Sequence, residues 1–160
     1  MGIDQKQWER ARSSTAAEGA PISNALIQVT RMHMMVARQL LKRLGLHPGQ
    51  ELLLMHLWDS GAQRQSVLAS IFATDSAAMT RTVQRLENAG LVERRSDPTD
   101  GRATLVAATA ASQLIRQGLE NVWTELESLT VRDMTEEDQE RLMTGLIALE
   151  KNLSAVITES

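Results

Sequence analysis

The sequence predicts a mainly α-helical protein with one small β-hairpin, and three observations lead to this fold class. Of its 160 residues, 42% are hydrophobic, yet there is no Tyr and only one Phe, so aliphatic residues must form the core. This composition, which is also poor in Gly, favours helices over a sandwich or barrel. Apolar residues recur at helical spacing towards both ends of the chain, and a strand-like period occurs only between residues 91 and 107.

The first part of the chain predicts an N-terminal extension followed by a long helix. Residues 1–21 are polar, contain Trp8 and end in Gly19-Ala20-Pro21, so we expect at most a short helix there. Apolar positions then alternate at spacings of four and three residues until Gly45, which is expected to end the helix in a left-handed cap. This stripe consists of Ile22, Leu26, Val29, His33, Val36 and Leu40. A shorter helix is predicted over residues 50–59.

The last third of the chain repeats the pattern of the first. One helix is expected to contain Ile115 and Leu129, and another Leu142 and Val156. Thr135, followed by three acidic residues, is typical of a helix N-cap. These long helices have more apolar surface than a small central domain can cover. We therefore expect a second copy of the chain to cover it, through a dimerisation region formed by residues 22–45 and 110–158, although an intramolecular bundle is the alternative.

Residues 46–109 predict a winged helix-turn-helix. A helix over residues 65–72, with Val67, Leu68 and Ile71 inward, is followed by a tight connection and by Asp75, the expected N-cap of a helix over residues 76–88. The period then changes to that of two strands, at 91–95 and 103–107, joined by a loop at 96–102 that contains Pro and Gly. Helix, turn, helix and hairpin in this order make the winged motif.

One face of the predicted helix over residues 76–88 is suited to DNA. Met79, Val83 and Leu86 share the inward face, whereas the opposite face begins with small residues and continues with hydrogen-bonding ones. A helix fits the major groove, where base edges are displayed. On an isolated helix these residues would only solvate a surface, but their place before a basic hairpin favours DNA contact. The expected contacts are Ser76, Ala77, Thr80, Arg81, Gln84 and Arg85.

The predicted hairpin adds further candidates. Arg102, near its tip, is expected to enter the minor groove, whose negative potential attracts Arg. Asp100 is expected to structure the wing through a salt bridge or backbone hydrogen bonds, because a carboxylate facing phosphate would repel it. Arg94 and Arg95 are candidates for phosphate contact. One of these two arginines could instead pair with Asp97 or Glu93, and the sequence does not decide which.

In these motifs the chain resembles the multiple-antibiotic-resistance regulator (MarR) family of winged-helix transcription factors. The resemblance is clearest over residues 46–109 and extends, through the long flanking helices, from Ile22 to the C-terminus. Two departures concern the wing: Gly101 stands where a second basic residue is common, and Ala108-Thr109 stands where the family tends to have a leucine-threonine pair. The matching motifs are Ser66-Val67-Leu68-Ala69, Met79-Thr80-Arg81, LENAGLV at residues 86–92, Arg94, Arg95 and DPTDGR at residues 97–102.

Membership of that family implies a homodimer that binds a pseudo-palindromic DNA operator, usually as a repressor, and that leaves DNA on binding a small aromatic or anionic effector. It also implies that Thr80, Arg81 and Arg102 are the residues most apt to touch DNA. Family pockets lie between the dimerisation helices and the DNA-binding lobe, and the effector candidates there are His33, Arg38, His56 and Trp58. A structural role is the alternative for each of them, including a pair between His56 and Asp59 on one helix.

Composition and charge limit the other possibilities. There is no Cys, which excludes disulfides and thiol-based sensing, and no pattern typical of a metal site, cofactor site or enzyme. No signal peptide or membrane-spanning run is expected, so we predict a cytoplasmic protein. The net charge is −3, but residues 60–109 carry six Arg against five acids, and the acidic excess lies in the last third. A winged-helix module that binds protein rather than specific DNA is the competing hypothesis.

Overall fold

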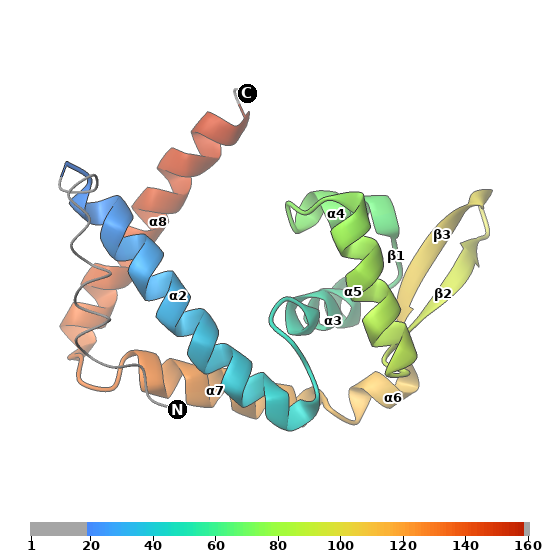
Figure 1. The fold of residues 1–160 in the computed structure, drawn as a ribbon, viewed down its shortest axis with the longest axis horizontal. Helices are drawn as coiled ribbons and strands as arrows, with labels where there is room; N and C mark the ends of the chain where they lie inside the picture. Colours follow the sequence, from blue (N-terminus) through green and yellow to red (C-terminus); the bar gives the residue numbers. More distant parts are fainter. Residues whose placement is uncertain (1–18, 159–160) are drawn as a thin grey trace. The chain divides into compact units, whose positions relative to one another are not determined.

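The computed structural model describes residues 19–158, apart from the side chains of residues 101, 102 and 158. Trp8 and nearly all of the predicted extension over residues 1–21 lie outside the described residues. The chain divides into two compact units between Trp123 and Thr124. The elements are α2 (Pro21–Leu41), the 3-10 helix η2 (Lys42–Leu44), α3 (Gln50–Ser60), β1 (Gln63–Arg64), α4 (Gln65–Ile71), α5 (Ser76–Asn88), β2 (Val92–Asp97), β3 (Asp100–Ala108), α6 (Ala110–Gln113), α7 (Arg116–Thr130) and α8 (Glu136–Thr158) (Figure 1).

The predicted fold class is confirmed. Figure 1 shows α3, α4 and α5 gathered beside the β2–β3 hairpin, which is the winged helix-turn-helix expected from the sequence. Helix α5 has the predicted bounds, and the Asp75 carboxylate accepts a hydrogen bond from the Ala78 N–H at 2.7 Å, as an N-cap does. Gly45 has the predicted left-handed backbone, with φ at 70°.

The sheet has one more strand than the sequence analysis predicted. The strand order is β1-β3-β2, all antiparallel, with Arg64 opposite Leu105 and Val92 opposite Ala108. Strand β1 has only two residues, too few to show a period of two. The expected loop over residues 96–102 was also wrong, since β2 continues to Asp97 and β3 begins at Asp100, and Pro98-Thr99 form the turn.

The core of the winged helix is aliphatic. Met79, Val83 and Leu86 of α5 are buried as predicted. Helix α4 differs, because only Leu68 is buried, whereas the side chains of Val67 and Ile71 are 40% and 50% exposed. A two-turn helix packed on one side can bury only a narrow stripe, and here the stripe passes through Leu68 and the half-buried Phe72, four residues on. Other buried residues are Leu53, Leu54, Leu57, Val92 and Val106.

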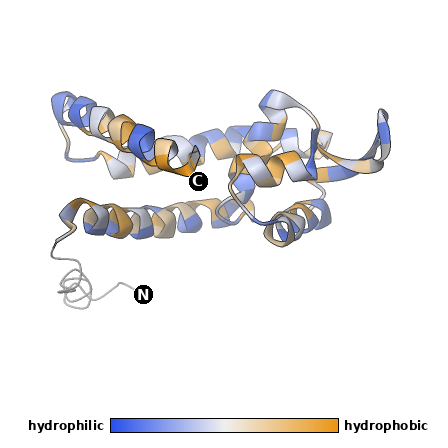
Figure 2. Cartoon of the chain, turned by 90° about the horizontal axis from the view of Figure 1, so that it is seen from above, coloured by the Kyte–Doolittle hydropathy of each residue, from blue (hydrophilic) through white to orange (hydrophobic). Residues whose placement is uncertain are grey.

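The two longest helices carry apolar side chains that this chain leaves open to solvent. Figure 2 shows orange, apolar residues interspersed with polar ones along α8, the helix that ends beside the C label. On α2, Ile22 and Val29 are more than half exposed, and His33 is half-buried rather than enclosed. On α8, five apolar side chains are more than half exposed: Met143, Ile147, Leu153, Val156 and Ile157.

Helix α8 begins as predicted. The Thr135 hydroxyl accepts a hydrogen bond from the Asp138 N–H at 3.2 Å and donates one to the Asp138 carboxylate at 2.7 Å. This is a variant capping box with an acid at the third helical position. Within residues 19–158, no helix combines the length and the apolar run needed to cross a bilayer.

Candidate nucleic-acid interface

Helix α5 turns its polar face to solvent, as its sequence predicts. The side chains of Ser76, Ala77, Thr80, Arg81, Gln84 and Arg85 are all exposed, opposite the buried Met79, Val83 and Leu86. This orientation follows from the helical period, because the apolar residues alone fix which side faces the core. The candidate contacts on α5 are therefore brought together on one surface.

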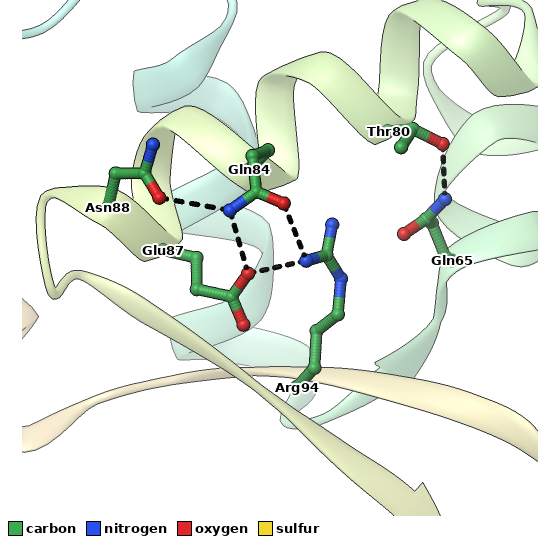
Figure 3. A network of polar contacts seen from close by, with 6 residues as sticks. All are labelled: Gln65, Thr80, Gln84, Glu87, Asn88 and Arg94. Atoms are coloured by element: carbon green, nitrogen blue, oxygen red, sulfur yellow. Dashed lines mark hydrogen bonds and ion pairs between the residues drawn. The ribbon is translucent and has the colours of Figure 1, made fainter.

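The first turn of this surface is bridged to α4. The Thr80 hydroxyl donates to the Ser76 carbonyl at 2.7 Å and accepts from the Gln65 side-chain amide at 2.8 Å. Gln65 was not among the predicted site residues, because nothing in the sequence places α4 and α5 at a particular angle. This contact ties the first residue of α4 to the surface (Figure 3).

A polar network connects the second half of α5 to the wing (Figure 3). Arg94 of β2 forms an ion pair with Glu87 and donates to the Gln84 side-chain oxygen at 3.1 Å. The Gln84 amide nitrogen in turn donates to Glu87 at 3.3 Å and to Asn88 at 2.9 Å. Two predicted contact residues, Gln84 and Arg94, are thus engaged with each other and with an acidic residue that the sequence analysis did not single out.

The structure decides how the wing-base arginines pair. Arg95 pairs with Glu93, whereas Arg94 pairs with Glu87, a partner that the sequence analysis did not consider. Neither of the two arginines pairs with Asp97. On α5, by contrast, Arg81 and Arg85 have no ion-pair partner among the described residues, so they carry the open positive charge of this surface.

Asp97 anchors the wing together with Asp100, for which the sequence analysis predicted this role. The Asp97 side chain is almost fully buried and accepts hydrogen bonds from the Thr99 N–H at 2.8 Å and the Thr99 hydroxyl at 2.6 Å. It also forms an ion pair with Arg64 of β1 at 2.7 Å. Asp100, which is exposed, forms the predicted salt bridge, an ion pair with Arg64 at 3.8 Å. These Asp97 contacts explain the tight turn, because a side chain that bonds two residues onward replaces a longer loop.

The same contacts make the wing sensitive to acid. Hydrogen bonds from the Thr99 hydroxyl and N–H, assisted by Arg64, lower the pKa of Asp97 to about 2 from its ordinary value of 3.8. Because the folded-state pKa is the lower one, this stabilisation is present above about pH 4 and is lost as the pH falls towards 2. We expect Asp97→Asn to lower the melting temperature at pH 7, with a difference from the parent that shrinks below pH 4. Thermal melts from pH 7 to pH 2 measure this, and a constant difference would contradict it.

A polar groove of about 260 Å³ lies between β1, the start of α4 and the hairpin. Two arginines from different strands line it, together with hydroxyl and amide side chains. The residues are Arg64, Gln65, Ser66, Arg94, Ala103 and Thr104. The groove adds hydrogen-bonding groups beside the α5 surface, while both of its arginines are paired with acidic residues.

One of the four effector candidates, Trp58, lies at a cavity of the structure. The cavity has a volume of about 120 Å³, and its walls include Met55, Leu119 and Trp123. The Trp58 indole N–H donates to the Ser112 hydroxyl at 2.9 Å, and the Arg116 guanidinium lies 5.4 Å from the Trp58 ring centre. Asp59 and Glu120, at 3.7 and 3.4 Å from Arg116, complete the lining.

The suggested pair between His56 and Asp59 was wrong. Asp59 faces Arg116, and the His56 ring packs edge-on against Phe72 with ring centres 5.8 Å apart. Three residues of separation permit a contact on a helix, but the neighbouring elements offer each side chain a different partner. Among the described residues, no group of three or more His, Asp or Glu is arranged to hold a metal ion.

The winged helix-turn-helix of this chain matches a known protein family. The family model described as MarR family matches residues 46–104, which span α3, α4, α5 and most of the hairpin. Over these residues the chain resembles the MarR family. The family resemblance predicted from the sequence is confirmed, and the family and fold are those of transcription regulators rather than enzymes.

A curated relative and several solved structures are similar to this chain. The uncharacterized HTH-type transcriptional regulator YdgJ of Bacillus subtilis (strain 168) is 34% identical over 103 residues, which is 64% of this chain and 51% of that protein. The match thus spans about half the length of that relative. Among solved structures, a crystal structure of MarR covers 89% of this chain and 97% of its own, with 25% identity and a TM-score of 0.78.

Two further structures extend this likeness. A probable transcriptional regulator from Pseudomonas aeruginosa is 28% identical, covers 82% of this chain and 98% of its own, and has a TM-score of 0.74. A mutant MarR from E. coli complexed with operator DNA is 22% identical, covers 86% and 99%, and has a TM-score of 0.78. At that identity the last comparison shows a shared fold only.

Proposed function

We propose that this chain is a transcriptional regulator that binds a specific DNA operator as a homodimer. The observation that carries the proposal is the exposed face of α5. Small residues begin this face, and Arg81 and Arg85 follow, both without an ion-pair partner in the described part of the chain. Small side chains allow close approach to a groove floor, and Arg is the side chain that most often reads guanine there. The operator complex described for the mutant E. coli MarR supports the same use of the fold.

In this proposal each predicted residue has a place. Ser76, Ala77, Thr80, Arg81 and Arg85 face the major groove, with Gln84 on the same surface. Arg102 enters the minor groove, and Asp100, with Asp97, shapes the wing that carries it. Of the arginines at the wing base, Arg95 contacts phosphate, because its pair with Glu93 is well exposed and easily exchanged. Arg94 is engaged by both Glu87 and Gln84.

Dimerisation supplies the second half of the site. The exposed apolar residues of α2 and α8 belong to the predicted dimerisation region, residues 22–45 and 110–158, and the DNA-binding domain is residues 46–109. Exposed apolar area of this extent on long helices is typical of an interface with a partner chain. A symmetric dimer places two copies of α5 on one face of the duplex, about 34 Å apart.

Footprinting on the intergenic DNA beside its own gene tests this function. We expect protection of two half-sites one helical turn apart, with nanomolar affinity that weakens steeply as salt rises. An arbitrary duplex of equal length is the control and should bind far more weakly. The competing protein-interaction module predicts no salt-dependent DNA affinity and a stoichiometric protein partner instead, and that result would replace the regulator.

We also propose that the regulator is a repressor released by a small aromatic effector at the Trp58 cavity. Trp58 and Trp123 offer apolar aromatic walls, whereas Asp59 and Glu120 already satisfy Arg116 and would repel a further anion. This favours the aromatic over the anionic class of effector. Quenching of Trp fluorescence by a panel of planar aromatics, followed by loss of operator binding at the same concentrations, tests this. Quenching that survives Trp58→Phe and leaves DNA binding unchanged would contradict it.

A further inference from the structure

We propose that Glu87 is a positioning residue that restrains the DNA interface by keeping Arg94 and Gln84 occupied within the protein. The inference rests on the proposed function and names a residue that limits the affinity of this interface for DNA. Figure 3 shows the arrangement: Glu87 lies near the end of α5 and faces Arg94, which reaches across from β2. Arg81 and Arg85 remain as the side chains of α5 that carry open charge.

The hydrogen bonds of Gln84 leave its amide little capacity for a base. A carboxamide has two N–H donors and one carbonyl oxygen. In this structure its nitrogen donates to Glu87 and Asn88, and its oxygen accepts from Arg94. Reading a base edge would require Gln84 to give up these bonds, so its net gain from DNA is small.

Arg94 is restrained in the same way by charge. A guanidinium that is already neutralised by a carboxylate gains little by exchanging it for a phosphate, and it adds little to the release of counterions from DNA. The side chains of Arg94 and Glu87 are only 26% and 31% exposed, whereas those of Arg95 and Glu93 are 61% and 45% exposed. Solvent screens the second pair more strongly, so Glu87 is the more effective restraint.

The location of Arg94 explains why its release would matter. Arg94 lines the polar groove beside α5 together with Arg64 and Ser66. Arg64 is itself held by Asp97. With Glu87 neutralised, Arg94 would become the unpaired cation of that groove, next to the surface that meets the DNA backbone. Such a contact carries no sequence information, because phosphates are the same at every base pair.

The test compares Glu87→Gln with the unsubstituted dimer on operator DNA and on an arbitrary duplex, over a series of salt concentrations. Glutamine keeps the size and hydrogen-bonding capacity of the side chain and removes its charge. We expect affinity for both DNAs to rise by about the same factor, so that their ratio stays as in the parent, and the slope of log K against log salt to steepen by about 0.9 for the one released Arg. Glu93→Gln removes the same charge at the exposed pair and should change the slope much less.

The double variant Glu87→Gln/Arg94→Ala separates release of Arg94 from simple loss of negative charge. We expect the steeper slope to disappear in the double variant. If the steeper slope persists there, or if Glu87→Gln leaves it unchanged, the proposal is overturned. Arg94→Ala alone gives an independent reading: the slope should stay as in the parent, and a decrease of about 0.9 would mean that Arg94 already contacts phosphate. Failure of the parent protein to bind any DNA would overturn the proposed function, and this inference with it.

Discussion

Replacing Arg81 with Ala should weaken operator binding by about 1–3 kcal/mol, roughly 5- to 150-fold in Kd, and should leave affinity for unrelated DNA nearly unchanged. Arg81 is exposed near the middle of α5 and has no ion-pair partner among the described residues. Its guanidinium is therefore free to make two parallel hydrogen bonds to a base edge. The Arg81→Ala variant should also discriminate less between base pairs at the position that Arg81 contacts, because only the operator with the matching base loses affinity.

The measurement is a pair of titrations for each variant, one on the footprinted operator and one on an arbitrary duplex, at one fixed salt concentration. Arg141→Ala is the matched control, since it removes the same charge from α8, where Arg141 pairs with Glu137 and Asp138. An equal loss on both DNAs would assign Arg81 to a phosphate rather than a base. If affinity falls on neither DNA, Arg81 does not contact DNA and α5 is not part of the interface.

The sequence was sufficient to predict those features of the fold that depend on a single helix or turn. The bounds of α5 and the exposure of its polar face follow from the Asp75 cap, the spacing of Met79, Val83 and Leu86, and the Ala89-Gly90 end. The cap at Thr135 and the left-handed Gly45 are equally local. Each of these features depends on residues within a few positions of one another, so the pattern contains the whole cause.

The sequence was insufficient where two elements meet. The pairs Glu87–Arg94 and Arg64–Asp97 join residues on different elements, and the second joins residues 33 positions apart. Several acids near each arginine are equally plausible partners until the strands are placed. The same holds for Val67 and Ile71, which are apolar yet exposed because the angle of α4 selects Leu68 instead. Side-chain pairs between different elements are thus the part of the interface that could not be predicted from the sequence.

Replacing Leu146 with Glu should dissociate the dimer, with a dimer Kd raised roughly a thousandfold. Leu146 is 42% exposed in the single chain, so a partner chain has apolar surface left to cover. It lies on the apolar stripe of α8, which consists of Leu142, Leu146, Leu149, Leu153 and Val156. Each copy would lose about 2 kcal/mol of stabilisation from apolar burial. Because both copies carry the substitution, the free energy of dimerisation weakens by about 4 kcal/mol in all. The buried carboxylates would add to this cost.

The matched control is Thr144→Glu, because residues two apart on a helix lie about 200° around its axis, so position 144 faces away from the stripe. Sedimentation velocity over a range of protein concentrations gives the assembly state of each variant. We expect the parent and the control to be dimers and Leu146→Glu to be monomeric at micromolar concentration.

A monomer that presents one α5 can engage only one half-site, so the operator footprint should shrink and the affinity should fall towards that for unrelated DNA. A dimeric Leu146→Glu variant would exclude the stripe from the interface, and a monomeric parent would remove the dimer from the proposed mechanism.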